Sequence, residues 1–351
     1  MKIVLKISIG IIVILVFLIG RMLFNSGFFT KTASHFEGTI TEISGFSGAE
    51  DIAIDRSKGF ALISSNDFSQ KKPNQVIKNG AIYLLNLNDS EPKLINLTNN
   101  LPFADFHPHG ISLYNSENGH KILFVINHRK SGNYIDIFQF SDSSLVYQES
   151  ITDSLFISPN DIVGVGERSF YLTNDHDEKL SEWRSKKDLL QIPMGNICYF
   201  DGQKSKIAAK GFNYANGINS SQNGEKLFMA ATSGQKIIVF DRSKKTGNLT
   251  QSDAIPINGA DNIDIDEAGN LWVGCHPNLL AFLSHSKDHS KISPSEIVKI
   301  NYRGKNDFTL KSIYTNDGKA VSGSSVGAVF GNKLIIGTVF ENKVLIGNMK
   351  I

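Results

Sequence analysis

Hydrophobic and polar residues alternate along most of the chain, and the stretch 260–278 is the clearest example. Ile263 and Ile265 alternate with acidic residues, a turn follows at 267–270, and a second apolar run begins at Leu271. Period-two alternation on both sides of a Gly-Asn turn predicts a β-hairpin. The polar residues at the strand ends lie where a site could be built.

The same pattern of a polar start, an apolar strand, a turn and a second strand occurs six times, at intervals between 45 and 64 residues. The copies begin at Glu50, His109, Asn160, Asn216, Asp261 and Ser325. Repeats of several strands are typical of propeller blades. We therefore predict an all-β fold, a six-bladed β-propeller with a central tunnel, preceded by an N-terminal hydrophobic helix. The six strand starts should meet around the propeller axis.

The predicted chain has three parts. They are a signal anchor at 1–24, a linker at 25–36, and the propeller domain at 37–351. Gly38 to Ile43 should form a strand that pairs with the last blade and closes the ring, which removes exposed sheet edges. Asp177 to Leu190 is predicted to be a helix that interrupts the β pattern, and Leu279 to Ser284 is predicted to be an outer strand.

The N-terminal segment has a basic start followed by the apolar run Ile7 to Gly20 and then Arg21. This run is shorter than the roughly 20 residues that cross a bilayer, but Lys6 and Arg21 can extend to the headgroups. We expect an uncleaved membrane anchor that places the propeller outside the cytosol, in the periplasm or extracellular space. A cleaved signal, and therefore a secreted protein, is the alternative.

Composition narrows the possible functions. The formal net charge is only +2, so there is no electrostatic case for nucleic-acid binding. Cys198 and Cys275 form no disulfide framework, and are either free buried thiols or a single bridge. No G-x-S-x-G motif is present, which argues against a serine hydrolase.

The polar residues at the strand starts offer mainly oxygen atoms. They are Glu50, Asp51, Asn160, Asp161, Asn216, Asp261 and Asn262. Ca²⁺ takes six to eight oxygen ligands, whereas zinc prefers His or Cys. Asp and Asn at a strand start are often only turn residues, but their recurrence in four repeats favours a shared calcium site. Alternation along the strand would place the two members of a pair at different levels, which predicts two cation sites along the axis.

Two histidines occur together in the second repeat. His109 stands at the start of one predicted strand, and His128 ends the next. A hairpin would bring them close together. Histidine is suited to proton transfer near neutral pH, so the pair is a candidate for acid–base catalysis. A single histidine is more often structural.

Taken in order, these motifs resemble those of the paraoxonase family of calcium-dependent lactonases and arylesterases. The matching segments are 49–51, 108–112, 160–163, 173–176, 211–218, 261–263, 271–278 and 336–340. They cover the chain from about Gly45 to Phe340. The resemblance implies a six-bladed propeller with two calcium ions in its central metal tunnel.

The resemblance also implies a role for each residue. The exposed, catalytic calcium would be held by Glu50, Asn160, Asn216, Asp261 and Asn262, and the buried, structural calcium by Asp51, Asp161 and the backbone oxygen of Ile111. His109 and His128 match the histidine dyad of the family, and Tyr214 and His276 match positions that line its pocket. The animal enzymes join their termini with a disulfide. Here no cysteine lies near either end, so ring closure rests on strand pairing.

The expected function is therefore calcium-dependent hydrolysis of a lactone or aryl ester. Calcium would polarise the carbonyl, and the His dyad or a carboxylate such as Glu50 or Asp261 would activate water. A gluconolactonase-like enzyme acting on sugar lactones is one alternative. A non-catalytic, calcium-stabilised propeller that binds a ligand is another. The expected partners are a small-molecule substrate and, through the N-terminal segment, a membrane.

Overall fold

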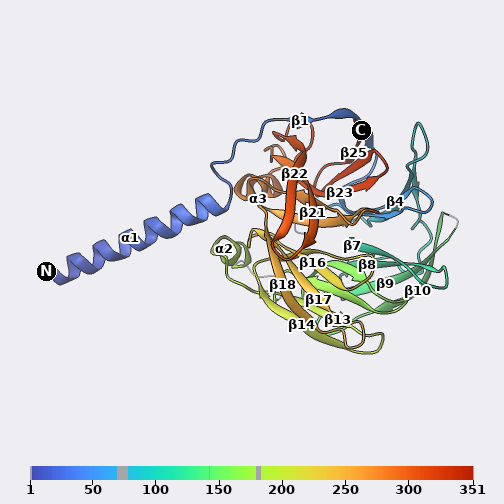
Figure 1. Cartoon of the computed structure of the whole chain (residues 1–351), viewed down its shortest axis with the longest axis horizontal. Helices are drawn as coiled ribbons and strands as arrows, with labels where there is room; N and C mark the ends of the chain where they lie inside the picture. The colour runs from blue at the N-terminus through green and yellow to red at the C-terminus, as the bar shows by residue number, and fades with distance from the viewer. Residues whose placement is uncertain (1, 69–77, 142, 179–182, 351) are drawn as a thin grey trace.

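A computed structural model describes residues 2–68, 78–141, 143–178 and 183–350. Helix α1 (Lys2–Asn25) projects from a ring of β-sheets (Figure 1). Within the described residues the ring contains six blades, each starting with an innermost strand beside the central channel. This arrangement confirms the predicted fold class.

The first three blades follow the chain in order. The first contains β3 (Ala49–Asp55), β4 (Phe60–Ser65), β5 (Ala81–Asn86) and β6 (Leu94–Asn96). The second contains β7 (Pro108–Asn115), β8 (Lys121–Arg129), β9 (Gly132–Ser141) and β10 (Ser144–Ile151). The third contains β11 (Pro159–Gly164), β12 (Phe170–Asn174), β13 (Gly195–Phe200) and β14 (Ser205–Phe212).

The last three blades complete the ring. The fourth contains β15 (Ala215–Ser220), β16 (Lys226–Ala231), β17 (Lys236–Arg242) and β18 (Leu249–Pro256). The fifth contains β19 (Ala260–Ile265), β20 (Leu271–Cys275), β21 (Ser295–Gly304) and β22 (Asp307–Asn316), with β1 (His35–Phe36) on its outer edge. The sixth contains β23 (Ser324–Phe330), β24 (Lys333–Thr338), β25 (Lys343–Met349) and β2 (Gly38–Ser44).

The two ends of the chain close the ring by strand pairing. β2 runs antiparallel to β25, from the pair Gly38 and Met349 to the pair Ser44 and Lys343. The predicted closing strand is therefore confirmed. The sixth blade is built from both ends of the propeller domain, and the ring closes without a disulfide.

The core lies between the blades. Six clusters of buried apolar side chains each fill the gap between two neighbouring blades. In one of them, Ile52 and Ile63 of the first blade pack with Val326 and Ile335 of the sixth. Apolar burial on both faces of each blade is what holds the ring together, and it fixes the innermost strands around the channel.

Every innermost strand carries a register shift close to its start. The shifts lie between Ala49/Asp51, Pro108/Ile111, Pro159/Ile162, Ala215/Ile218, Ala260/Ile263 and Ser324/Val326. A β-bulge breaks strict alternation and redirects side chains. Strict period-two alternation is therefore interrupted near the start of each innermost strand.

Two short helices differ from the sequence-based predictions. α2 spans only Arg184–Leu189; residues 177 and 178 are not helical, and 179–182 lie outside the described residues. The predicted outer strand from Leu279 is wrong, because that segment forms helix α3 (Leu279–Lys287). The side chain of Asn278 caps α3 by accepting a hydrogen bond from the Ala281 amide, a local signal that outweighed the apolar run.

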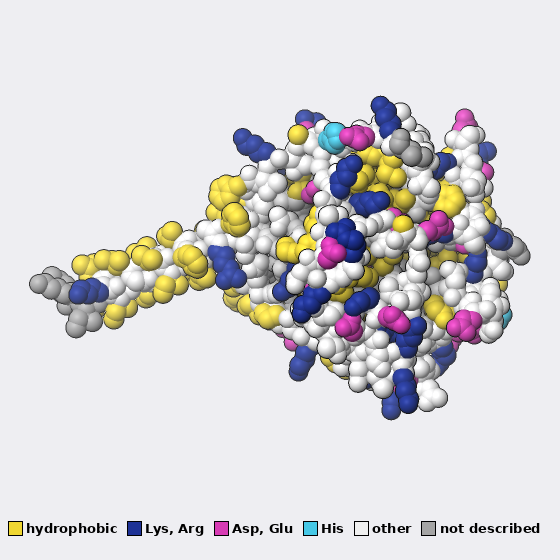
Figure 2. All heavy atoms as spheres, viewed as in Figure 1, with side chains coloured by type: hydrophobic (Ala, Val, Ile, Leu, Met, Phe, Trp, Pro, Cys, Tyr) yellow, Lys and Arg dark blue, Asp and Glu magenta, His cyan; other side chains and the backbone are white. Residues whose placement is uncertain are grey.

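Helix α1 is long and apolar enough to cross a membrane, with a candidate span of 22 residues from Val4 to Asn25. Its surface is covered with hydrophobic side chains (Figure 2). The C-terminal end of α1 is attached to the propeller. Asn25 Nδ2 donates to Gln191 Oε1 at 2.9 Å, and the Leu279 amide donates to the Ser26 carbonyl at 2.8 Å. α1 therefore ends beside the segments that carry α2 and α3.

Candidate active site

The predicted site residues of four blades meet at one end of the channel, which we call the site mouth. Asn262 Nδ2 donates to Glu50 Oε1 at 2.9 Å, and Asn216 Nδ2 donates to Asp261 Oδ1. Asp261 and Asn262 are consecutive, yet both join the cluster, because the bulge in β19 interrupts alternation. The cluster therefore combines residues more than 200 positions apart.

Two glycines allow the neighbouring inner strands to approach closely. A Cβ at Gly110 would lie 2.6 Å from the Asn160 carbonyl oxygen, and one at Gly217 would lie 2.3 Å from the Asp261 carbonyl oxygen. Both distances are too short for any side chain. His109-Gly110 and Asn216-Gly217 thus place a functional side chain directly before a position where only glycine fits.

Four buried side-chain oxygens at the site mouth have no hydrogen-bond partner. They are Glu50 Oε2, Asn160 Oδ1, Asn216 Oδ1 and Asn262 Oδ1. An unpaired buried polar atom is costly, so four in one place indicate a missing electropositive partner. Within the described residues no group of three His, Cys, Asp or Glu side chains is arranged to hold a metal ion. A mixed carboxylate and amide oxygen set fits a hard cation such as calcium better than zinc.

Asp51 and Asp161 lie deeper in the channel and are almost completely buried. Asp51 accepts hydrogen bonds from the amides of Ile52 at 2.8 Å and Ile111 at 2.7 Å. Burial, reinforced by the charge of Glu50, raises the pKa of Asp51 to about 8. Burial and the charge of Asp51 likewise raise the pKa of Asp161 well above its usual value. Two buried carboxylates facing mainly backbone amides would be stabilised by a cation.

The two predicted dyad histidines are in direct contact. His109 Nδ1 lies 2.9 Å from His128 Nε2, and His109 Nε2 lies 3.6 Å from Glu50 Oε1. Burial alone would lower the pKa of His109, but the carboxylates of Glu50, Asp175 and Asp261 together outweigh it and the pKa is raised. Burial and the neighbouring His109 lower the pKa of His128 to about 4. The pair is thus set up with His109 as the more basic member.

Two further histidines flank the cluster. His276 Nε2 lies 2.9 Å from Asp261 Oδ2, and its ring stacks on Phe282 of α3 at a centroid distance of 3.7 Å. His176 contacts the ring of Tyr214 edge-on at 5.5 Å. His276 therefore contacts the cluster directly, whereas Tyr214, two residues before Asn216, packs against the ring of His176.

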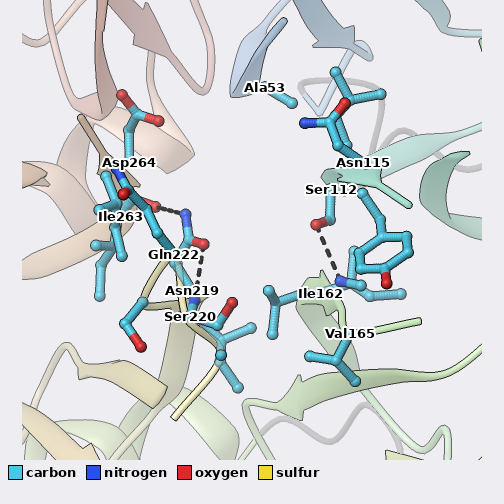
Figure 3. A pocket seen from close by; sticks show the side chains of 18 of the residues that line it. Ala53, Ser112, Asn115, Ile162, Val165, Asn219, Ser220, Gln222, Ile263 and Asp264 are labelled. Carbon is cyan, nitrogen blue, oxygen red and sulfur yellow. Dashed lines mark hydrogen bonds between the residues drawn. The ribbon is translucent and has the colours of Figure 1, made fainter. Parts of the chain in front are cut away.

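The channel also opens at its opposite end, the far mouth, into a cavity of about 590 Å³. It is lined by the ends of the inner strands and reaches Asp51 and Asp161. Figure 3 shows this cavity, with Asn219 bonded to the Ile263 carbonyl at 2.8 Å on one wall and Ser112 on the other. The deeper carboxylates thus face the far mouth, while the histidines lie at the site mouth.

Sequence reasoning left out several residues that support the site. The Thr173 and Thr232 hydroxyls donate to the carbonyls of Asn216 and Ala260, each at 2.7 Å. Ser325, in the sixth repeat, donates to the Glu50 carbonyl at 2.7 Å. All three are small hydroxyl residues at strand ends, and only the repeat position could have indicated them. Both cysteines are free and buried, which settles the choice between thiols and a bridge.

Comparison with known proteins decides the family. Residues 40–347 match the model of the arylesterase family. The chain belongs to this family. It is similar to serum paraoxonase/arylesterase 1 of Mus musculus, with 34% identity over 308 residues that cover 82% of each chain. The resemblance inferred from the motifs is confirmed.

Solved structures agree on the fold of this arylesterase-family chain. A gluconolactonase from Xanthomonas campestris has a TM-score of 0.53 and 12% identity, covering 90% of this chain and 91% of its own. The calcium-binding protein regucalcin from Agrobacterium tumefaciens has a TM-score of 0.51 and 11% identity, covering 88% and 96%. At these identities the likeness shows a shared propeller-like fold and no more.

Proposed function

We propose that this chain catalyses the calcium-dependent hydrolysis of lactones and aryl esters at the site mouth. Membership of the arylesterase family makes it a carboxylic ester hydrolase. The observation that carries the finer proposal is the group of four buried, unpaired oxygens beside the histidine pair. Such a set supplies both a cation site and a proton acceptor, which is what ester hydrolysis by water requires.

The proposed cation ligands form two levels. Glu50, Asn160, Asn216, Asp261 and Asn262 would hold the calcium at the site mouth, and Asp51, Asp161 and the Ile111 carbonyl would hold the deeper one. Calcium, when bound, supplies positive charge that polarises the substrate carbonyl and stabilises the oxyanion. Asp51 and Asp161 each accept a hydrogen bond from an amide of the next blade, Ile111 and Ile218 respectively, which supports a structural role for the deeper level.

His109 is the proposed general base. Its Nε2 faces the oxygen cluster and would accept a proton from the attacking water, while the hydrogen bond to His128 orients the ring. Asp261 is less available as a base, since its two carboxylate oxygens already contact Asn216 and His276. Glu50 has one unpaired oxygen and is the competing candidate. Tyr214 and His276 would line the substrate pocket.

We also propose that residues 1–24 anchor the chain in a membrane, that 25–36 form a linker, and that the propeller (37–351) lies outside the cytosol. The apolar surface of α1 supports an anchor or a secretion signal. Exposed Phe28, Phe29 and Trp183 also support a membrane surface as the partner, since aromatic rings are enriched at bilayer interfaces.

The test is an assay of the full-length chain in detergent with a simple lactone, phenyl acetate and a sugar lactone. Hydrolysis of the first two should be lost with EDTA and restored by calcium but not by zinc. His109→Gln should lower kcat by roughly 10²-fold or more while calcium still stabilises the fold. Activity on the sugar lactone alone would favour a gluconolactonase. Calcium-stabilised protein without any hydrolysis would favour a binding module.

A further inference from the structure

Asn133 lies between the histidine pair and a neighbouring loop. It faces His128 across the β8–β9 hairpin, whose turn is Lys130-Ser131. Its Nδ2 donates to the carbonyl oxygens of Phe156 at 2.9 Å and Ile157 at 3.1 Å. Carbonyl oxygens can only accept hydrogen bonds, so the orientation of the Asn133 amide is fixed by two independent partners. Its Oδ1 therefore points to His128 Nδ1, at 2.8 Å.

This orientation determines where the ring protons lie. An amide oxygen only accepts, so His128 Nδ1 must carry the hydrogen. A neutral imidazole has one N–H group, which leaves His128 Nε2 as an acceptor. The 2.9 Å contact then requires His109 Nδ1 to be the donor. His109 Nε2 is left with a free lone pair on the side of Glu50 and the oxygen cluster.

Glu50 favours the opposite arrangement. Its Oε1 lies 3.6 Å from His109 Nε2 and would attract a hydrogen to that atom. With the hydrogen on Nε2, His109 Nδ1 would accept a hydrogen bond from His128 Nε2. His128 Nδ1 would then be unprotonated and would face the Asn133 oxygen. That arrangement would place two acceptors against each other at 2.8 Å, an unfavourable contact in a buried site. Asn133 therefore favours one tautomer of the histidine pair, and Glu50 favours the other.

We propose that Asn133 is a positioning residue that fixes the tautomers of both histidines, so that His109 always presents a proton-accepting Nε2. The proposal deepens the proposed function and rests on His109 as its base. Asn133 does not touch the substrate site itself; it acts through His128. Its second role, the pair of bonds to the carbonyls of 156 and 157, is structural and separable from the first.

Two substitutions separate these roles. Asn133→Asp keeps an acceptor for His128 but loses the donor to Phe156 and Ile157. Asn133→Leu has a similar volume and loses both. If Asn133 sets the tautomers, kcat should fall by roughly 10-fold in the Leu variant with KM little changed, and stay within roughly threefold of wild type in the Asp variant. A purely structural role predicts equal losses in both.

A spectroscopic measurement tests the same idea without relying on activity. In histidine-labelled full-length protein, the ¹⁵N shifts of His128, assigned with a His128→Gln variant, should show a protonated Nδ1 and a bare Nε2 in wild type and in Asn133→Asp. The Leu variant should show a mixture. A bare Nδ1 in wild type, or an unchanged pattern in Asn133→Leu, would overturn the proposal. An inactive wild type with a protonated His128 Nδ1 would instead count against the proposed function, because the tautomer inference would have held.

Discussion

Replacing Asp161 with alanine tests the deeper cation level most directly. The Asp161 side chain accepts hydrogen bonds from the amides of Ile162 at 2.7 Å and Ile218 at 2.6 Å, and Ile218 belongs to the next blade. Each buried amide left without a partner costs about 1–3 kcal/mol. Loss of both should remove about 2–6 kcal/mol of hydrogen-bond stabilisation. Without calcium, relief of the repulsion between Asp161 and Asp51 offsets part of this loss.

Calcium adds a second, separable effect. A ligand that binds only the folded state at 100 times its dissociation constant stabilises it by about 2.7 kcal/mol. Wild type should gain this stabilisation from each calcium site that is occupied. Asp161→Ala should lose the stabilisation that comes from the deeper calcium site. Urea unfolding with EDTA and with calcium measures both quantities. Asp161→Asn, which keeps the volume and an acceptor oxygen, is the matched control and should lose the calcium term but less of the amide term.

The reasoning would be refuted in two distinct ways. If Asp161→Ala unfolded within about 1 kcal/mol of the uncharged Asp161→Asn variant in EDTA, the two amide bonds would not carry the stability assigned to them. If calcium stabilised Asp161→Ala as much as wild type, Asp161 would not be a ligand, whatever its structural role.

Three other predictions concern separate parts of the molecule. Asn216→Ala removes an unpaired buried oxygen at the site mouth. We expect kcat to fall by roughly 10²-fold or more, while the free energy of unfolding falls by less than about 2 kcal/mol. Full activity would exclude Asn216 as a ligand. Burial would lower the pKa of His176, but Asp175 and Asp188 raise it to about 9, so the stability His176 adds is complete below pH 6.5 and is lost as the pH rises to 9. The stability difference between wild type and His176→Gln at saturating calcium should therefore shrink by about 1–2 kcal/mol over that range, and a constant difference would contradict this pairing. Finally, the full-length chain should fractionate with membranes and a variant lacking residues 2–24 should not; cytosolic full-length chain would exclude the anchor.

The blade repeat could be predicted because every blade packs apolar side chains against its two neighbours, and each uses the same alternating pattern to do so. The candidate site residues could be grouped for the same reason: they occupy one repeat position, and a ring brings such positions together. The bulges were not visible, since a register shift depends on the partner strand. They explain why both Asp261 and Asn262 reach the cluster, which simple alternation would forbid.

Local exceptions to the repeat were harder to predict. The short apolar run from Leu279 could be a buried strand by length, yet its Leu and Ala residues favour a helix, which the Asn278 cap and the stacking of Phe282 on His276 stabilise. Asn133 was missed because its significance depends on three contacts, with His128 and with two carbonyls of a distant loop. Nothing in the alternating pattern distinguishes it from an ordinary asparagine near a turn.

The pairing of β2 with β25 has a consequence for how the protein is made. Residues 38–44 leave the ribosome some 300 residues before their partners at 343–349. At roughly 5–20 residues per second, β2 must wait about 15–60 s before β25 exists. During that time the ring is open and β2 is a strand without a neighbour. The side chains of β2 are mostly exposed even in the finished protein, and one of them is the charged Glu42, which opposes pairing with other chains during the wait.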